Sequence, residues 1–278
     1  MQIAHGIAEH SARYDDFAMY MASHGFVVVT NDHLGHGKSI SEDENLGFFA
    51  EENGWSVAVQ DMHILHEMMQ EEYSLPHFLF GHSMGSFLAR TYIIYHRAGL
   101  SGVILSGTGR QTPATIKAGR LVGEYEAKRH GLKYKSERVN ALAFGSYNKG
   151  FPSARTGSDW ISRDAAVVDE YMSDKLCGYV PTVGLFLDML VGLSIIGSRK
   201  KQQHMNKNLP VFFISGDKDP VGENGAGVIA VYKSFLDAGM ENVTLKLYHN
   251  GRHEMLNELN KADVYCDVLS WIEGTLSV

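Results

Sequence analysis

The sequence has 278 residues, of which 44% are hydrophobic and 21% are charged. This length is sufficient for one large domain, or for one domain with a sizeable insertion. The formal charge of −7 and the isoelectric point near 6.0 argue against nucleic acid or an anionic membrane as the main partner.

Strand and helix patterns alternate in the first and last parts of the chain. Residues 26–30, Phe-Val-Val-Val-Thr, form a continuous apolar and β-branched run, which is typical of a parallel strand buried on both faces. This alternation predicts βαβ units and a mostly parallel sheet flanked by helices. The other predicted strands are 77–80, 102–106, 211–215 and 243–248, and the predicted helices are 56–73, 84–97, 226–238 and 257–276.

Residues 109–208 interrupt this alternation. They contain no clear strand but several helical patterns, such as that of residues 115–130. The apolar stretch 185–196 is too short to span a bilayer, and we interpret it as a buried helix, with a surface that meets lipid as the alternative. We therefore predict a catalytic core of residues 1–108 and 209–278, into which a helical cap of residues 109–208 is inserted.

The cysteines and the N-terminus bear on the compartment. Only Cys177 and Cys266 are present, without the spacing of a metal site, and this fits a reducing environment. The first residues show no basic segment followed by an apolar stretch, and no run reaches the length of a membrane span. We therefore expect a cytoplasmic protein.

A candidate nucleophile lies at a predicted strand-to-helix junction. Gly81-His82-Ser83-Met84-Gly85 has the form G-x-S-x-G, in which small residues permit the sharp turn that exposes a serine. By chance, this chain would contain the motif roughly 0.2 times, so the motif alone is weak. Its position after a strand and before a helix is what favours Ser83 as a nucleophile.

A serine nucleophile requires a base and an orienting carboxylate, which follow it in the order acid, then histidine, in this type of fold. Asp217 and Asp219 come directly after the predicted strand 211–215, and His253 comes after the strand 243–248. All three positions are at the carboxyl ends of strands, where open α/β sheets bind their ligands.

Three other patterns suggest different chemistry, and we reject them. His253-Glu254 begins an H-E-x-x-H zinc pattern, but Asn257 replaces its second histidine. Residues 37–39 end like a phosphate-binding loop, but Asp32 replaces its first glycine. His63 and His66 lie on an amphipathic helix, where packed or solvated side chains are expected. No metal or organic cofactor is implied, because a triad supplies nucleophile and base itself.

Three motifs together resemble the monoacylglycerol lipase and lysophospholipase branch of the α/β-hydrolase superfamily, of the serine aminopeptidase S33 type. Residues 5–14 are similar to its HGxxEHxxRY loop, residues 32–39 to its DHxGHGxS turn, and residues 81–85 to its GHSMG elbow. Residues 169–177 are similar to a segment of its cap. The resemblance covers nearly the whole chain.

The resemblance implies roles for individual residues. Ser83, Asp219 and His253 would form the triad, with Asp219 preferred to Asp217 because the family places its acid three residues after a glycine, here Gly216. The backbone N–H groups of Ile7 and Met84 would form the oxyanion hole. The supporting residues implied are Gly6, Glu9, His10 and Arg13 in the first loop and Gly81, His82 and Gly85 at the elbow.

The expected function is hydrolysis of carboxylic esters through an acyl-enzyme, with monoacylglycerols or lysophospholipids as substrates. The cap would enclose an apolar acyl tunnel, with residues 185–196 as a candidate wall and a transient contact with a membrane surface as a further expectation. Alternatives are small aryl, short-chain, amide or peptide substrates, and a non-catalytic binding protein. The retained Ser83, Asp219 and His253 disfavour the last.

The chain departs from the family pattern at its start. Family members carry two further strands and a complete third strand before the HGxxEH loop, whereas this sequence begins at the tail of that third strand. We therefore expect an exposed sheet edge, which a second copy of the chain or another segment would cover.

Overall fold

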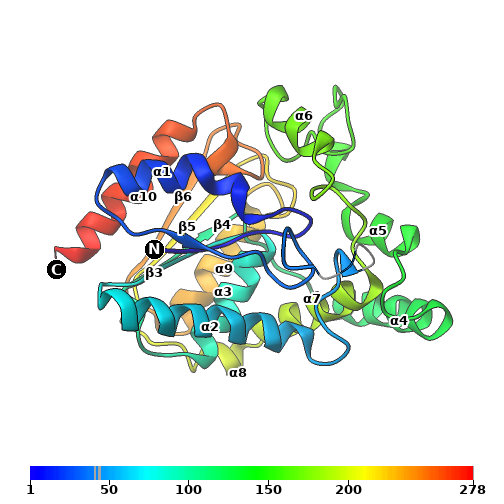
Figure 1. The fold of residues 1–278 in the computed structure, drawn as a ribbon, viewed down its shortest axis with the longest axis horizontal. Helices are drawn as coiled ribbons and strands as arrows, with labels where there is room; N and C mark the ends of the chain where they lie inside the picture. Colours follow the sequence, from blue (N-terminus) through cyan, green and yellow to red (C-terminus); the bar gives the residue numbers. More distant parts are fainter. Residues whose placement is uncertain (41, 43–44, 278) are drawn as a thin grey trace.

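The computed structural model describes residues 1–40, 42 and 45–277. Six parallel strands form one sheet in the order β2-β1-β3-β4-β5-β6, with helices on both faces (Figure 1). This confirms the predicted α/β-hydrolase type of fold. The strands are β1 (Gln2–Ala4), β2 (Val29–Thr30), β3 (Phe78–His82), β4 (Gly102–Ser106), β5 (Val211–Gly216) and β6 (Val243–Tyr248).

The α-helices are α1 (Asp15–Ser23), α2 (Gly54–Tyr73), α3 (Met84–Tyr95), α4 (Pro113–His130), α5 (Glu137–Phe144), α6 (Ala165–Ser173), α7 (Val183–Ile196), α8 (Arg199–Gln202), α9 (Ala226–Asp237) and α10 (Lys261–Leu276). Short 3-10 helices cover Ser11–Tyr14, Tyr147–Gly150 and Met255–Asn257.

The buried strands are apolar on both faces, because each face packs against a layer of helices. Phe78 and Phe80 of β3 belong to the core shared with α1 and α10, whereas Leu79 belongs to the core shared with α2, α3 and α9. The same alternation continues in β4, where Ile104 lies on the first side and Leu105 on the second. Two hydrophobic layers therefore enclose the sheet.

Most predicted elements lie within a few residues of their positions in the structure. The strand predicted for residues 26–30 is shorter, because its partner β1 covers only Gln2–Ala4 and the ladder pairs only Val29 and Thr30. The last helix begins at Lys261, after a 3-10 turn, rather than at 257. Helix α1 was not predicted from the sequence pattern.

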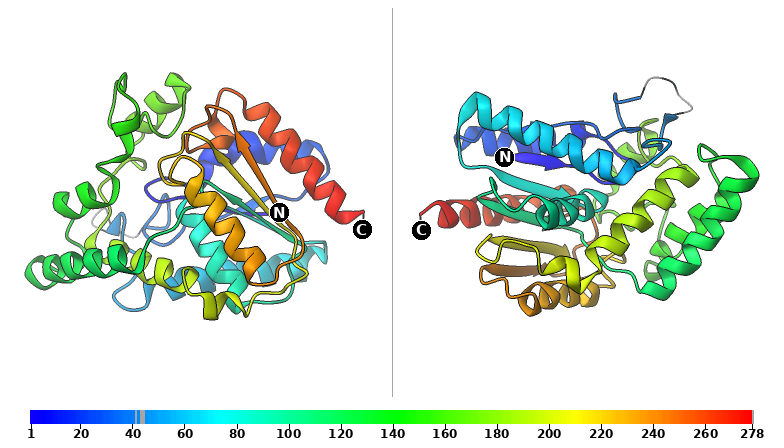
Figure 2. Two further views of the ribbon diagram at one scale, coloured as in Figure 1. Left: turned by 180° about the vertical axis from the view of Figure 1, so that it is seen from behind. Right: turned by 90° about the horizontal axis from the view of Figure 1, so that it is seen from below.

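The residues between β4 and β5, all of which are described, contain five α-helices and no strand. We call residues 109–208 the cap segment. Figure 2 shows α4, α5 and α6 standing away from the sheet, beyond one end of the strands. Helix α7 instead packs against α2 and α3 of the core.

Helix α7 contains the apolar stretch 185–196, and most of its residues are buried. A Cβ at Gly192 would overlap the indole ring of Trp55 in α2, so the two helices approach closely there. Of the two interpretations of this stretch, the structure bears out the buried helix. None of the helices in the described part of the chain has the length and hydropathy of a membrane span.

The strand order indicates where on the sheet a ligand-binding site is expected. The chain moves from β1 outward to β2, and then returns across β1 to β3. Ligands bind in the crevice at such a reversal point, at the carboxyl ends of the strands. The loop after β1 and the turn after β3 flank this crevice. β2 is the edge strand on this side of the sheet and β6 on the other; coverage of the β2 edge by a second chain remains a prediction.

Candidate active site

Ser83 lies at the turn between β3 and α3, in a strained backbone conformation. Its φ of 51° and ψ of −119° lie in a region that residues other than glycine rarely adopt. The turn is possible because its neighbours lack side chains. A Cβ at Gly81 would lie 2.5 Å from the carbonyl oxygen of Gly85, and a Cβ at Gly85 would overlap the carbonyl oxygen of Ala4. These contacts give the physical reason for both glycines.

His253 and Asp219 form a fully buried pair. The Nδ1–H of His253 donates to both carboxylate oxygens of Asp219, at 3.0 Å each. Asp219 is 0% exposed, and it also accepts hydrogen bonds from the Ser215 hydroxyl (3.2 Å) and the Val221 N–H (2.9 Å). The carboxylate is thus held in place from three sides, and Nε2 of His253 is left for other partners.

Asp217 lies elsewhere in the same loop. Its carboxylate accepts from the Asn250 N–H (2.8 Å) and contacts Nδ1 of His249 (3.1 Å). Asp217 therefore joins the loops after β5 and β6 and does not contact His253. The geometry supports Asp219 as the acid partner of His253.

The electrostatic surroundings favour a basic imidazole at His253. Burial by itself lowers the pKa of His253, but the charge of Asp219, its hydrogen bond and the nearby carboxylates of Glu254 and Glu9 outweigh this, and the net pKa is raised. A raised pKa makes the neutral ring a better proton acceptor near neutral pH.

Two aromatic rings hold the His253 imidazole in place. His82 lies on one side, with ring centroids 4.7 Å apart, and Trp160 of the cap segment lies at 5.0 Å. Nδ1 of His82 contacts the Ser106 hydroxyl of β4 at 3.2 Å, and burial lowers the pKa of His82 to about 3, so its ring is neutral. The contact of Trp160 with His253 was not predicted, because the two residues lie 93 positions apart and nothing in the local sequence around Trp160 indicates it.

The loop after β1 lies beside Ser83. A Cβ at Gly6 would lie 3.1 Å from Cβ of Ser83. Ile7 and Met84 both line the same cavity as Ser83. Met84 is the first residue of α3, where backbone N–H groups have no partner within the helix. This arrangement suits two N–H donors to an oxyanion.

His5 holds this loop, a role that the sequence analysis did not assign. Its Nδ1 contacts the Gly6 carbonyl at 2.7 Å, and its Nε2 accepts from the His33 N–H at 2.9 Å. Burial, together with His33 and His36, lowers the pKa of His5 well below 6.5. A neutral ring that donates through Nδ1 and accepts through Nε2 satisfies both contacts.

A network of charges links the loop after β1 to the loop that carries His253. Glu9 accepts from the Gly6 N–H and from the Tyr14 hydroxyl (2.8 Å), and lies 3.4 Å from Nε of Arg13. Arg13 also forms an ion pair with Glu254, the residue after His253. These contacts are structural, because they position the two loops relative to each other.

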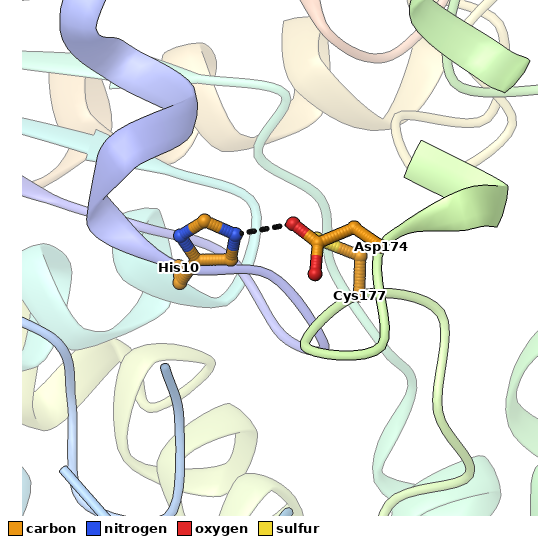
Figure 3. A group of neighbouring side chains, drawn as sticks. All are labelled: His10, Asp174 and Cys177. Carbon is orange, nitrogen blue, oxygen red and sulfur yellow. Dashed lines mark hydrogen bonds and ion pairs between the residues drawn. The ribbon is translucent and has the colours of Figure 1, made fainter. Parts of the chain in front are cut away.

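His10 makes a different contact from its neighbours in the motif. Its Nε2 lies 2.8 Å from a carboxylate oxygen of Asp174 in the cap segment, near Cys177 (Figure 3). The first loop is therefore attached to the core through Arg13 and to the cap segment through His10.

The residues of the three rejected motifs make structural contacts. Glu254 of the incomplete zinc pattern binds Arg13 and accepts from the Asn257 amide (3.0 Å). Asp32 accepts from the N–H groups of Ser11 and Lys38, so a carboxylate organises the turn at 37–39. His63 and His66 lie within a group of packed aromatic rings.

Two cavities meet at Ser83. The first, of about 270 Å³, contains polar side chains from both the core and the cap segment. The second, of about 160 Å³, is bounded mainly by apolar side chains. Ile7, Ser83, Phe144 and Trp160 line both cavities. The polar residues of the first are Glu9, His82, Asn140, Ser158, Tyr171, Tyr179, His253 and Glu254; the apolar wall of the second includes Phe87, Leu142, Phe186, Met189, Leu190, Leu193 and Val221.

Comparison with known proteins gives matches along nearly the whole chain. The family model described as serine aminopeptidase, S33 matches residues 1–260. A monoacylglycerol lipase of Mycolicibacterium smegmatis is 26% identical, over 99% of this chain and 88% of its own length. The human monoglyceride lipase is 25% identical, over 97% of this chain and 80% of its own length.

Solved structures agree with these sequence matches. A thermostable carboxyl esterase from Bacillus coagulans, solved in complex with glycerol, superposes with a TM-score of 0.91 at 32% identity, over 99% of this chain and 89% of its own. A monoglyceride lipase variant from Saccharomyces cerevisiae superposes with a TM-score of 0.73 at 19% identity and shows the shared fold.

Proposed function

Because the chain belongs to the serine aminopeptidase S33 family, in the monoacylglycerol lipase-like branch of the α/β-hydrolases, we propose that it hydrolyses carboxylic esters through an acyl-enzyme formed on Ser83. The observation that carries the proposal is the buried Asp219–His253 pair, whose His253 lines the same cavity as the strained Ser83, where two cavities meet.

The proposed reaction uses each group in turn. Nε2 of His253 accepts the proton of the Ser83 hydroxyl as its oxygen attacks the ester carbonyl. The N–H groups of Ile7 and Met84 stabilise the negative charge on the carbonyl oxygen. His253 then protonates the leaving alcohol. In the second half of the reaction, His253 takes a proton from water, the water attacks the acyl-enzyme, and the proton returns to Ser83 as the carboxylic acid leaves. Asp219 fixes the ring and stabilises its charged form.

The two cavities suggest how an ester is oriented. The second cavity, with its apolar wall from α7, suits the acyl chain, which has no hydrogen-bonding groups. The first cavity suits the alcohol part, because it presents hydroxyl, amide and carboxylate groups. Such a division is what a monoacylglycerol requires, with its apolar chain and its small polyol on either side of one ester bond.

The charges of the first cavity favour an uncharged alcohol over a phosphate-bearing one. Glu9 and Glu254 line it, and the nearby Arg13 is already paired with both carboxylates. A lysophospholipid would place its phosphate near these carboxylates without a free cation among the residues that line this cavity. We therefore propose monoacylglycerols ahead of lysophospholipids.

The proposal is tested with a fluorophosphonate probe and a panel of substrates. Wild-type protein should be labelled and Ser83→Ala should not; labelling that survives the substitution would remove Ser83 from its role. Monoacylglycerols, lysophospholipids and p-nitrophenyl esters are then compared by kcat/KM. Turnover of aryl esters alone would overturn the assignment of the lipid substrate while keeping the serine hydrolase. A matched control is Ser86→Ala, which removes a nearby hydroxyl that donates to the Ser83 carbonyl (2.6 Å).

A further inference from the structure

His10, Asp174 and Cys177 form a cluster that the proposed reaction does not use. Nε2 of His10, a carboxylate oxygen of Asp174 and Sγ of Cys177 all lie within 4.8 Å of one another. Figure 3 shows the imidazole of His10 directed toward Asp174, with Cys177 behind the carboxylate. Among the described residues, no other group of three such side chains is this close.

The fold brings these residues together from two distant segments. His10 lies in the loop after β1, and the other two lie just after α6 in the cap segment. The same segments are joined by a backbone hydrogen bond from the Gly178 N–H to the Ala8 carbonyl, at 2.9 Å. The cluster therefore bridges the cap segment and the loop that carries Ile7. Sequence spacing could not reveal it, because more than 160 residues separate His10 from Asp174.

The turn after α6 already orients two of the donors. One oxygen of Asp174 accepts from the Leu176 N–H (2.8 Å), and the Cys177 N–H donates to the Asp174 carbonyl (3.0 Å). The other carboxylate oxygen is the one that contacts His10. Such supporting hydrogen bonds are typical of the residues around a metal ion, where they orient the ligands.

The donor set and its surroundings select the type of ion. Imidazole nitrogen, carboxylate oxygen and thiolate sulfur together suit zinc, whereas magnesium and calcium prefer oxygen ligands alone. Cys177 is buried, so its sulfur would be shielded from bulk solvent when it coordinates an ion. The Asp174 side chain is 34% exposed and provides a path from solvent.

We propose that His10, Asp174 and Cys177 bind a zinc-like divalent cation, with water completing the coordination, and that the ion clamps the cap segment to the loop after β1. The binding part of this inference is independent of the proposed hydrolysis. The clamp adds a consequence for it: a bound ion restrains the loop beside Ser83 and changes turnover.

Binding is tested on the full chain after treatment with a chelator. Titration with Co²⁺ should produce a thiolate-to-cobalt charge-transfer absorption, and calorimetry with Zn²⁺ should show one ion per chain. Cys177→Ser and Asp174→Asn should each weaken Zn²⁺ binding by roughly tenfold or more. Cys266→Ser is the matched control, since Cys266 is the only other cysteine and is exposed; it should bind as the wild type does.

The outcomes separate the two parts of the inference. Equal Zn²⁺ affinity in wild type and Cys177→Ser, or no thiolate absorption with Co²⁺, would overturn the site. Melting temperatures of the ion-free variants establish that they are folded, and Zn²⁺ should raise the melting temperature of wild type, Cys266→Ser and Ser83→Ala more than that of Cys177→Ser or Asp174→Asn. Ser83→Ala should bind as tightly as wild type, so loss of hydrolysis leaves this test intact. Binding that leaves turnover unchanged would retain the site and overturn the clamp.

Discussion

Trp160 of the cap segment lies against His253 of the core, with ring centroids 5.0 Å apart. The two segments are also joined through their backbones. The Glu254 N–H donates to the Ile161 carbonyl (2.7 Å), and the His253 N–H donates to the Trp160 carbonyl (3.4 Å). The position of the proposed base therefore depends on the cap segment as well as on the sheet.

Replacing Trp160 by alanine should lower kcat strongly but change the melting temperature little. Trp160 is only half-buried, but it limits the space in which the His253 ring can move. A misplaced base costs roughly 100-fold in rate. Trp160→Phe keeps a ring at this position and should retain most of the activity. Steady-state kinetics and melting curves of both variants check this; equal activity of Trp160→Ala and wild type would contradict it.

Replacing each of the two aspartates of the loop after β5 separately by asparagine should distinguish their roles. Asp219→Asn removes the charge that orients and stabilises the His253 ring, and kcat should fall roughly 1,000- to 10,000-fold, as in other serine triads. Asp217→Asn is the matched control, because Asp217 contacts His249 and Asn250 instead. Its kcat should stay within a few-fold of wild type. The reverse result would reassign the acid.

The midpoint of the acid limb of the pH–rate profile should lie above pH 6.5, the ordinary pKa of imidazole, because the pKa of His253 is raised. Only neutral His253 can accept the serine proton, so kcat/KM is lost as the pH falls through this raised pKa. Removing the Asp219 charge should move the acid limb to lower pH in the residual activity of Asp219→Asn. An acid limb below pH 6 in the wild type would contradict the assignment.

Filling the second cavity should shorten the preferred acyl chain. A cavity of about 150 Å³ holds one benzene ring in another protein, so about 160 Å³ suits an acyl tail of roughly six carbons within the wall. Gly119 lies in this wall, and a Cβ there would meet Leu190 and Phe186 at 3.3 Å. Gly119→Leu should lower kcat/KM for eight-carbon esters about tenfold more than for four-carbon esters.

Lys117→Leu provides the control for this prediction. Lys117 lies on the exposed face of the same helix, outside the cavity wall, and its replacement should change both substrates equally. Equal losses for short and long esters in Gly119→Leu would indicate a general disturbance of α4 instead of a shorter cavity.

The local pattern of the sequence was sufficient for the main elements of the core. Strands such as β4 and β6 lie at their predicted residues, because continuous or alternating apolar runs depend on burial alone. Helix α1 was missed, since its nine residues are too few to show a clear helical repeat of apolar positions. The β2 strand was predicted too long, since the length of a ladder depends on its partner strand.

The order of Ser83, the acid candidates and His253 at strand ends, and the glycines that the elbow requires, could be read from the amino-acid sequence. Only the packed fold shows which aspartate contacts His253, which cap residue lies against it, and where two cavities of different polarity meet. It also brought His10 beside Asp174 and Cys177. The physical reason is that strand and helix patterns arise from neighbouring residues, whereas these contacts join residues far apart in the chain and depend on how the helices pack on the sheet.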